Sequence, residues 1–298
     1  MQRGEIDKLP SKKVKIVTDS TAYLLSETIE RYDIRVVPLR VTFGTEAYAE
    51  GVDITNEEFY QRLAKSSRLP TTSQPPVSDF IRVYSELVQD GHPIFSIHIS
   101  GKLSGTINSA LAAREAFPQA EIEVVDWLSD GFGLVALAAA RAAEEGHGLA
   151  QIKATVKQLV ARMSCFGVLG TLEYLRKGGR IGGARALVGS LLRIKPILAL
   201  KGGDVKVLAK VRTEDKAIEY MLELVRKRME GSTFIHGAVV HTRALEGALK
   251  LEEAIRARLN CAELYLIELG PVLGTHIGPG LLGLGFYGDG EQQIDDSE

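Results

Sequence analysis

Residues 93–117 read PIFSIHISGKLSGTINSALAAREAF, and this stretch decides the fold class. The apolar run from Pro93 to Ile99 is typical of a buried strand. A turn of small and polar residues follows, and from Thr106 apolar residues recur at three- and four-residue spacing, as in an amphipathic helix. The stretch therefore predicts a strand, turn and helix unit of the kind found in α/β folds.

The same alternation recurs along the whole chain. Other apolar runs typical of buried strands are VKIV from Val14, IEVVD from Ile122, FIHGAVVH from Phe234 and AELYLIEL from Ala262. Helical spacing is found in SDFIRVYSELVQ (78–89), FGLVALAAARAAEE (132–145), TEDKAIEYMLELVRKRM (213–229) and ALEGALKLEEAIRARL (244–259). We therefore predict an α/β fold with largely parallel sheets.

The length of 298 residues suits two domains of middling size. The residue composition changes near residue 165, where the helical stretch LAQIKATVKQLVARMSC leads into the glycine- and arginine-rich GTLEYLRKGGRIGGARALVG. We expect an N-terminal α/β domain over residues 14–164 and a C-terminal α/β domain over residues 165–290.

Composition excludes several classes of protein. A hydrophobic content of 45% and a net charge of −2 fit a soluble globular protein, without a global field for nucleic acid or an anionic membrane. Cys165 and Cys261 stand far apart, without the spacing of a zinc site or a disulfide framework. No apolar run approaches the roughly 18 residues of a membrane-spanning helix. We expect a cytoplasmic protein with no stable membrane insertion.

One local charge patch interrupts this balance. The segment from Tyr174 to Gly203 contains no Asp or Glu. Its basic residues are Arg176, Lys177, Arg180, Arg185, Arg193, Lys195 and Lys201. Such a run forms either a solvated face or a site for an anion or a partner, and the pattern alone leaves both open.

The turn SGKLSGT, from Ser100 to Thr106, suggests catalysis but fits neither common template. A P-loop reads GxxxxGK[ST], whereas Leu103 follows Lys102 here. A hydrolase nucleophile elbow reads GxSxG, and the glycines around Ser104 are each displaced by one place. The nearest histidine, His98, precedes the turn on the same strand, so covalent catalysis is not favoured.

Geometry still favours an anion at this turn. Ser104, Gly105 and Thr106 lie at the predicted start of a helix after a strand, where free backbone N–H groups and the helix dipole attract negative charge. Ser104 can cap the helix, donate to a ligand, or do both by turns.

Two further stretches have similar features. In LPTTSQPPVSDF, Thr71 and Thr72 precede Pro75 and Pro76, which suit the first turn of a helix because proline lacks the N–H group. In ELGPVLGTHIGPGLLGLGF, glycines and two prolines surround His276, and a glycine-rich loop permits close backbone approach. Each stretch is either a structural feature or part of a binding site, and no His, Asp and Glu cluster indicates a metal.

Taken together, the motifs resemble one family. They are KIVTDSTAYL from Lys15, VVPLRVTFG from Val36, PTTSQPPVSDF from Pro70, IHISGKLSGTINSA from Ile97, LEYLRKGGRIGG from Leu172, KVRTEDKA from Lys210 and GPVLGTHIGPGLLG from Gly270. In this order, from about residue 14 to 287, they resemble the DegV family. The chain departs from the common family pattern ISSGLSGTYQSA at residues 101–102 and 107–108.

The resemblance implies a bacterial fatty-acid-binding protein of two α/β domains, with the acyl-chain pocket between or beneath them. It implies no cofactor, and a ligand such as palmitate or stearate. It also implies that the protein presents its fatty acid to a separate fatty acid kinase, which phosphorylates the carboxyl group to an acyl phosphate. The binding protein itself would then be a carrier and not an enzyme.

The resemblance also implies roles for single residues. The carboxyl group would be held by the Thr72 and Ser104 hydroxyls, with Thr71, Gly105 and His276 close by. Such hydroxyls at two helix starts would hold a carboxylate without a fixed counter-charge. Arg212 matches an arginine that engages the kinase or its phosphate. From the residues alone, Arg212 is equally well read as part of a surface ion pair.

Two rival functions remain open. The first is an enzyme that acts on a phosphorylated small molecule, with the basic segment and the loop of His276 as its site. The second is a protein-interaction module without a ligand. The sequence lacks clustered carboxylates with metal-ligand spacing, which weighs against the enzyme.

Overall fold

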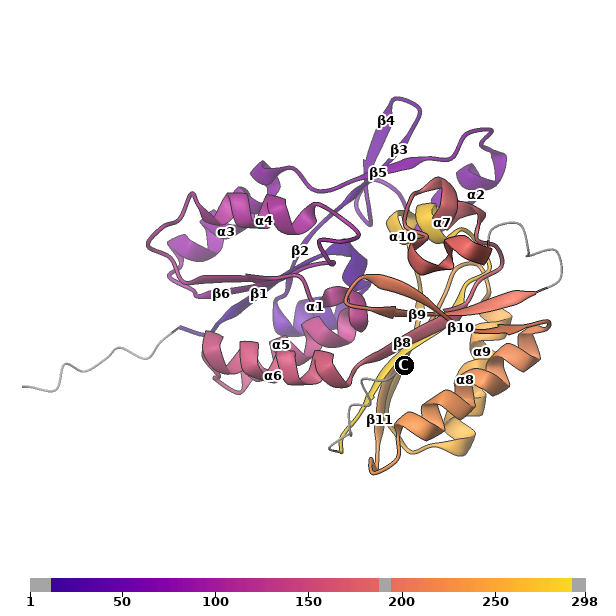
Figure 1. Cartoon of the computed structure of the whole chain (residues 1–298). Coiled ribbons are helices and arrows are strands. Elements are labelled where there is room, and N and C mark those ends of the chain that lie inside the picture. Colours follow the sequence, from indigo (N-terminus) through magenta and orange to yellow (C-terminus); the bar gives the residue numbers. More distant parts are fainter. Residues whose placement is uncertain (1–11, 188–193, 291–298) are drawn as a thin grey trace, which may run out of the picture.

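The protein is described by a computed structural model, which covers residues 12–187 and 194–290. Arg193, one of the basic residues singled out above, lies outside the described residues. The chain forms two main sheets with helices on their faces and a small third sheet at one side (Figure 1). The α/β fold class is confirmed.

The first sheet contains four parallel strands in the order β2-β1-β6-β7. These strands are β1 (Lys15–Asp19), β2 (Arg35–Val37), β6 (Ile94–Ile97) and β7 (Ile122–Val125). The helices around this sheet are α1 (Ser26–Tyr32), α3 (Val77–Gln89), α4 (Thr106–Arg114), α5 (Gly133–Glu144) and α6 (Leu149–Arg162). Apolar side chains of α3 and α4 cover one face, while those of α5 and α6 cover the other. The prediction of parallel strands is confirmed here.

The small sheet has three antiparallel strands in the order β4-β3-β5. They are β3 (Arg40–Phe43), β4 (Glu46–Ala49) and β5 (Thr71–Ser73), and helix α2 (Asn56–Lys65) packs beside them. We expected the hydroxyls of Thr71 and Thr72 at a helix start, but they lie on strand β5. Pro75 and Pro76 precede α3 instead of occupying its first turn, because a residue before proline favours an extended backbone.

The second sheet contains six strands in the order β10-β9-β8-β13-β11-β12. Its strands are β8 (Ser164–Val168), β9 (Lys195–Lys201), β10 (Asp204–Val211), β11 (Ile235–His241), β12 (Cys261–Glu268) and β13 (Leu282–Gly288). Helices α8 (Glu214–Arg228) and α9 (Leu245–Arg258) cover one face. Short helices are α7 (Glu173–Lys177), α10 (Pro271–Ile277), η1 (Ser20–Ala22), η2 (Leu128–Asp130) and η3 (Gly182–Leu187).

The expectation of largely parallel sheets is wrong for this second sheet. Only β11 and β12 pair in parallel, because α9 carries the chain back across the sheet between them. The other four pairs are antiparallel. A tight hairpin joins β9 to β10, and β13 is formed by the glycine-rich segment that we read as a loop. The predicted boundary coincides with the start of β8 at Ser164, and the division into two domains there stays our proposal.

The two main sheets share one apolar core. The largest buried cluster includes Ile16 and Phe95 of the first sheet, Leu198 and Val240 of the second, and Val135 of α5 between them. A polar contact between helix α5 and strand β12 reinforces this junction.

Arg141 of α5 donates two hydrogen bonds to Glu263 of β12, at 2.8 and 2.6 Å. His236 and Tyr265 also contact this carboxylate, at 2.9 and 2.8 Å. Although burial raises the pKa of Glu263, the hydrogen bonds from Arg141, His236 and Tyr265 lower it to about 2. The carboxylate therefore stays charged and ties helix to sheet.

Helix α10 is held in place by the buried side chain of Glu50. Its carboxylate accepts hydrogen bonds from the Ser20 hydroxyl at 2.5 Å, the Tyr23 hydroxyl at 2.9 Å and the backbone N–H of Val272 at 2.7 Å. The Tyr23 hydroxyl also accepts the N–H of Leu273 at 3.2 Å. Burial raises the pKa of Glu50 to about 7, against these hydrogen bonds, which lower it.

We predict that Glu50→Gln changes how stability depends on pH. A carboxyl group whose pKa rises on folding stabilises the fold fully below its unfolded pKa of about 4.5, and this stabilisation is lost as pH rises through about 7. The wild-type protein should therefore lose about 3 kcal/mol of unfolding free energy relative to the variant between these pH values. Urea unfolding of both proteins across this range measures the difference. A difference that does not vary with pH would contradict the assignment.

Candidate functional site

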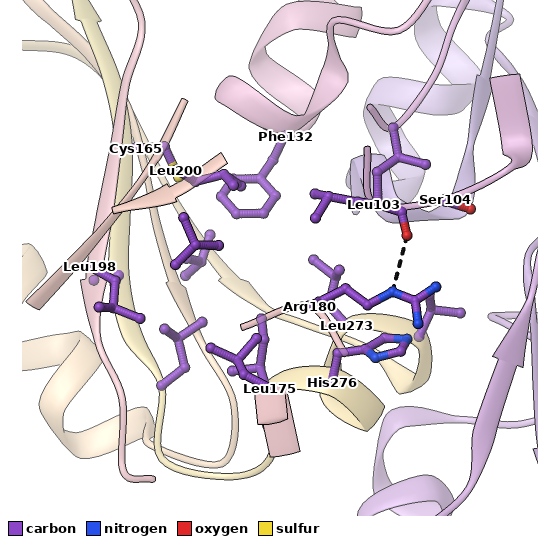
Figure 2. Close-up of a pocket in the computed structure, with 18 of the residues that line it drawn as sticks. Leu103, Ser104, Phe132, Cys165, Leu175, Arg180, Leu198, Leu200, Leu273 and His276 are labelled. Carbon is purple, nitrogen blue, oxygen red and sulfur yellow. Dashed lines mark hydrogen bonds between the residues drawn. The ribbon is translucent and has the colours of Figure 1, made fainter. Parts of the chain in front are cut away.

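A cavity of about 410 Å³ lies where the two main sheets meet. Its wall is mainly apolar and comes from both halves of the chain, including Ile99, Phe132, Leu175, Leu198, Val240 and Leu273. In Figure 2 the labelled apolar side chains surround an open interior, and Ser104, Arg180 and His276 gather at one end of it. The volume and the mainly apolar lining are typical of a site for a small apolar ligand.

Thr72 and His276 meet at the polar end of the cavity. Strand β5 carries Thr72, which pairs with Val41 of β3, and helix α10 carries His276. The Thr72 Oγ1 and His276 Nε2 atoms lie 2.7 Å apart. Thr71 is exposed and does not line the cavity, whereas Ser73, on the other side of Thr72 along β5, does line it. The structure therefore brings Thr72 and His276 together and leaves Thr71 outside.

Ser104 and Gly105 line the same end, at the start of α4. Gly105, and not Ser104, is the N-cap residue. Ser104 Oγ lies 2.9 Å from Thr106 Oγ1 and accepts the Thr106 N–H at 3.3 Å. Among the described residues, the N–H groups of Gly105 and Ile107 have no hydrogen-bond partner, so both remain available to an acceptor.

Gln74 joins these two parts of the site. Its Nε2 donates to Ser109 Oγ of α4 at 2.8 Å, and Gln74 also lines the cavity. A Cβ atom on Gly105 would come within 1.8 Å of Gln74 Oε1, so the Gln74 side chain would have to move to admit any other residue there. This packing holds the segment after β5 against the start of α4. Gln74 belongs to the motif PTTSQPPVSDF, but the residues around it in the sequence indicate no role for it.

Arg180 adds a cation that the sequence analysis did not assign to the site. The residue follows α7 and lines the cavity, where Nε donates to the Leu103 carbonyl at 3.2 Å and Nη1 to the Gly178 carbonyl at 2.6 Å. Figure 2 shows its guanidinium group beside His276 and close to Ser104. The expectation of a polar end without a positive charge is therefore incomplete. Arg180 lies in the acid-free segment 174–203 and in the motif LEYLRKGGRIGG, but neither pattern assigned it to this site.

The His276 ring is uncharged near neutral pH. Burial, and then the charge of Arg180, lowers the pKa of His276 to about 4. Its Nδ1 atom is buried and has no hydrogen-bond partner among the described residues. Gly178 packs against this nitrogen, since a Cβ atom there would lie 2.4 Å from it. His276 therefore contributes hydrogen bonding to the polar end without adding charge.

The basic segment does not form one continuous site. Lys177 pairs with Glu173 at 2.5 Å, and Lys201 donates to three carbonyl groups at the end of α6. Among the six basic residues of the segment that the structure describes, Arg180 is the one that lines the cavity.

His98 does not serve Ser104 as a base. Its Nε2 atom lies 2.7 Å from Ser96 Oγ, and its Nδ1 atom lies 3.2 Å from Asp19 Oδ2. This order of groups is that of a serine hydrolase triad, but the Ser96, His98 and Asp19 side chains are all fully buried, and none lines the cavity. Asp19 also accepts the N–H of Ile99 at 2.9 Å, so the network shapes the strand end that leads to the cavity.

Arg212, predicted for a partner contact, and Lys102, the lysine of the turn SGKLSGT, both lie away from the polar end. Arg212 is exposed after β10 and does not line the cavity. Lys102 forms an exposed ion pair with Asp204, at the turn between β9 and β10. A Cβ atom on Gly203 of that turn would come within 2.5 Å of Ser100 Oγ, so the turn packs closely on the loop of Lys102.

The described residues contain neither a cluster of metal ligands nor a helix that could span a membrane. No group of three or more His, Cys, Asp or Glu side chains is arranged to hold a metal within residues 12–187 and 194–290. In the same ranges, no helix has the length and apolar character needed to cross a bilayer.

Comparisons with known proteins agree with the motifs. The model of the family described as an uncharacterised protein of the DegV family matches residues 13–289. A DegV domain-containing protein of Halalkalibacterium halodurans is 38% identical over 281 residues, which are 92% of this chain and 98% of the relative.

Two solved structures of relatives are also similar. A fatty-acid-binding DegV family protein from Thermus thermophilus matches with a TM-score of 0.88 and 38% identity, over 93% of this chain and 100% of that chain. A stearic acid-binding protein from Eubacterium ventriosum matches with a TM-score of 0.84 and 29% identity, over 92% of this chain and 98% of that chain. With the family match across nearly the whole length, these likenesses show that the chain belongs to the DegV family.

Proposed function

We propose that this protein binds a long-chain fatty acid, such as palmitate or stearate, in the cavity between its sheets. The observation that carries the proposal is an apolar cavity of about 410 Å³ with Thr72, Ser104, Arg180 and His276 gathered at one end. Relatives of similar fold are described as binding fatty acids, one of them stearic acid, which supports the same class of ligand.

In this proposal the polar end holds the carboxylate. A carboxylate leaving water needs hydrogen-bond donors, or it takes up a proton instead. The Ser104 and Thr72 hydroxyls and the free N–H groups at the start of α4 supply donors, and Arg180 supplies positive charge. The Arg180 side chain is largely exposed, so solvent screens its charge and the ligand can still be released.

The apolar wall supplies most of the affinity. Each CH₂ group moved from water into the cavity contributes about 0.8 kcal/mol before the cost of immobilising the chain. A phosphorylated small molecule would gain nothing from the apolar wall. The cavity therefore favours the binding protein over the rival enzyme on phosphorylated substrates.

In this proposal the protein is also a carrier: it presents the bound fatty acid to a separate fatty acid kinase, which converts the acid to an acyl phosphate. This step rests on the family resemblance of the Arg212 segment. In support, Arg212 is exposed and lies outside the cavity, so it is accessible to another protein while the ligand is bound.

We predict that protein purified from cells carries fatty acid, detectable by mass spectrometry after extraction. Delipidated protein should take up palmitic or stearic acid, and Thr72→Val and Ser104→Ala should each weaken binding about tenfold, because each removes a hydrogen bond to a charged group. Calorimetric titration gives the affinities.

Thr71→Val is the matched control, because Thr71 neighbours Thr72 on β5 but is exposed and does not line the cavity. Its affinity should equal that of the wild-type protein. If delipidated wild-type protein takes up no fatty acid, or hydrolyses a generic phosphoester instead, the proposed function is wrong.

We predict that Arg212→Glu leaves fatty-acid uptake unchanged but abolishes acyl phosphate formation in a mixture with a bacterial fatty acid kinase and ATP. The charge reversal would repel the surface that Arg212 attracts. Lys157→Glu is the control, since Lys157 is an exposed cation on α6, remote from Arg212 in the sequence. Equal acyl phosphate formation by both variants would reject a role of Arg212 in the partner contact.

A further inference from the structure

Phe132 has a backbone conformation that residues with a side chain rarely adopt. Its φ is 51° and its ψ is −139°, in a region where glycine dominates. Tyr23 and Asp33 also have positive φ, but their ψ values of 43° and 48° are ordinary left-handed values. Phe132 is therefore the strained aromatic residue at the start of α5.

The segment around Phe132 is packed from both sides. A Cβ atom on Gly131 would come within 2.1 Å of the Met163 side chain. A Cβ atom on Gly133 would come within 2.8 Å of the Ala22 carbonyl oxygen. The Phe132 N–H donates to the Leu128 carbonyl at 3.0 Å, which closes the turn. Gly133 is required because the obstacle there is backbone, whereas the Met163 side chain would have to move to admit a side chain at residue 131. The strained position between the two glycines carries a ring.

The ring of Phe132 points into the cavity. It is 8% exposed and lines the wall. Figure 2 shows it between the polar residues Ser104 and Arg180 on one side and Cys165 on the other. Beneath it, Gly285 of β13 has no side chain, and a Cβ atom there would lie 3.5 Å from the ring. The ring thus occupies space that the second sheet leaves free.

We propose that Phe132 is the residue that determines how long and how bulky an acyl chain the cavity accepts. The inference rests on the proposed fatty-acid binding and adds the residue that selects among fatty acids. A strained backbone persists only where the surrounding structure holds it, and here it places a rigid ring in the wall of the cavity, beside Cys165. Removing the ring adds volume beside Gly285, and a longer or methyl-branched chain can fill that volume.

The test compares wild-type protein, Phe132→Ala, Phe132→Gly and Phe132→Leu. Each delipidated protein is titrated with myristic, palmitic, stearic and arachidic acids and with a methyl-branched palmitic acid. For Ala and Gly we expect the ratio of arachidic to palmitic affinity to rise at least about fivefold, since each extra buried CH₂ multiplies affinity by up to about fourfold. Leu should give a smaller change in the same direction, and it keeps the test valid where a larger truncation prevents folding.

Stability provides a second, independent readout. Gly adopts the backbone of residue 132 without strain, whereas Ala keeps the steric conflict of a Cβ atom. We therefore expect Phe132→Gly to unfold at a higher temperature than Phe132→Ala, although glycine usually destabilises a folded chain. If Phe132→Ala unfolded at the higher temperature, the backbone at residue 132 would not be strained, and this part of the inference would be wrong.

Phe117→Ala is the control for losing a ring elsewhere. Phe117 packs against Tyr84 on the far side of the first sheet, with ring centroids 6.4 Å apart, and does not line the cavity. Its loss should lower stability without changing the preference among acids. An unchanged preference in every Phe132 variant, while wild-type protein binds fatty acid, overturns this inference alone. No uptake by wild-type protein overturns the proposed function instead.

Discussion

The buried carboxyl group of Glu50 is the contact on which the site most depends. It lies after β4, yet its partners belong to the segment after β1 and to the first turn of α10. Helix α10 has only seven residues and cannot hold its position by its own hydrogen bonds. Because α10 carries Leu273 and His276 into the cavity, the geometry of the polar end follows from this one carboxyl group and the Tyr23 hydroxyl beside it.

The polar end of the cavity gathers groups that suit the proposed binding of a carboxylate. Thr72, Ser104, Arg180 and His276 come from four separate segments, and each supplies a hydrogen bond or a charge at the end of an apolar cavity. His276 is uncharged near neutral pH. The Ser96, His98 and Asp19 side chains, which have the order of a catalytic triad, are fully buried in the first sheet. What resembles catalytic chemistry in the sequence therefore serves the architecture, whereas the accessible groups are suited to holding an anion.

Local patterns predicted much of the fold. The helices over 78–89, 213–229 and 244–259 lie within about one residue of their predicted limits, because helical spacing of apolar residues reflects a face that must be buried. Strand pairing was predicted only where a helix joins consecutive strands. The antiparallel pairs of β8, β9, β10 and β13 depend on contacts between segments far apart in the chain, and the glycines of β13 hide its strand character.

The sequence by itself determined the α/β class, the family resemblance and the hydroxyl and histidine motifs from which Thr72, Ser104 and His276 were chosen. It did not put Thr71 outside the cavity, place Arg180 beside His276 or reveal the backbone of Phe132. Those features were decided only by the tertiary structure. The physical reason is that a motif depends on residues adjacent in the chain, whereas the direction of a side chain and the shape of a cavity depend on how distant segments pack together.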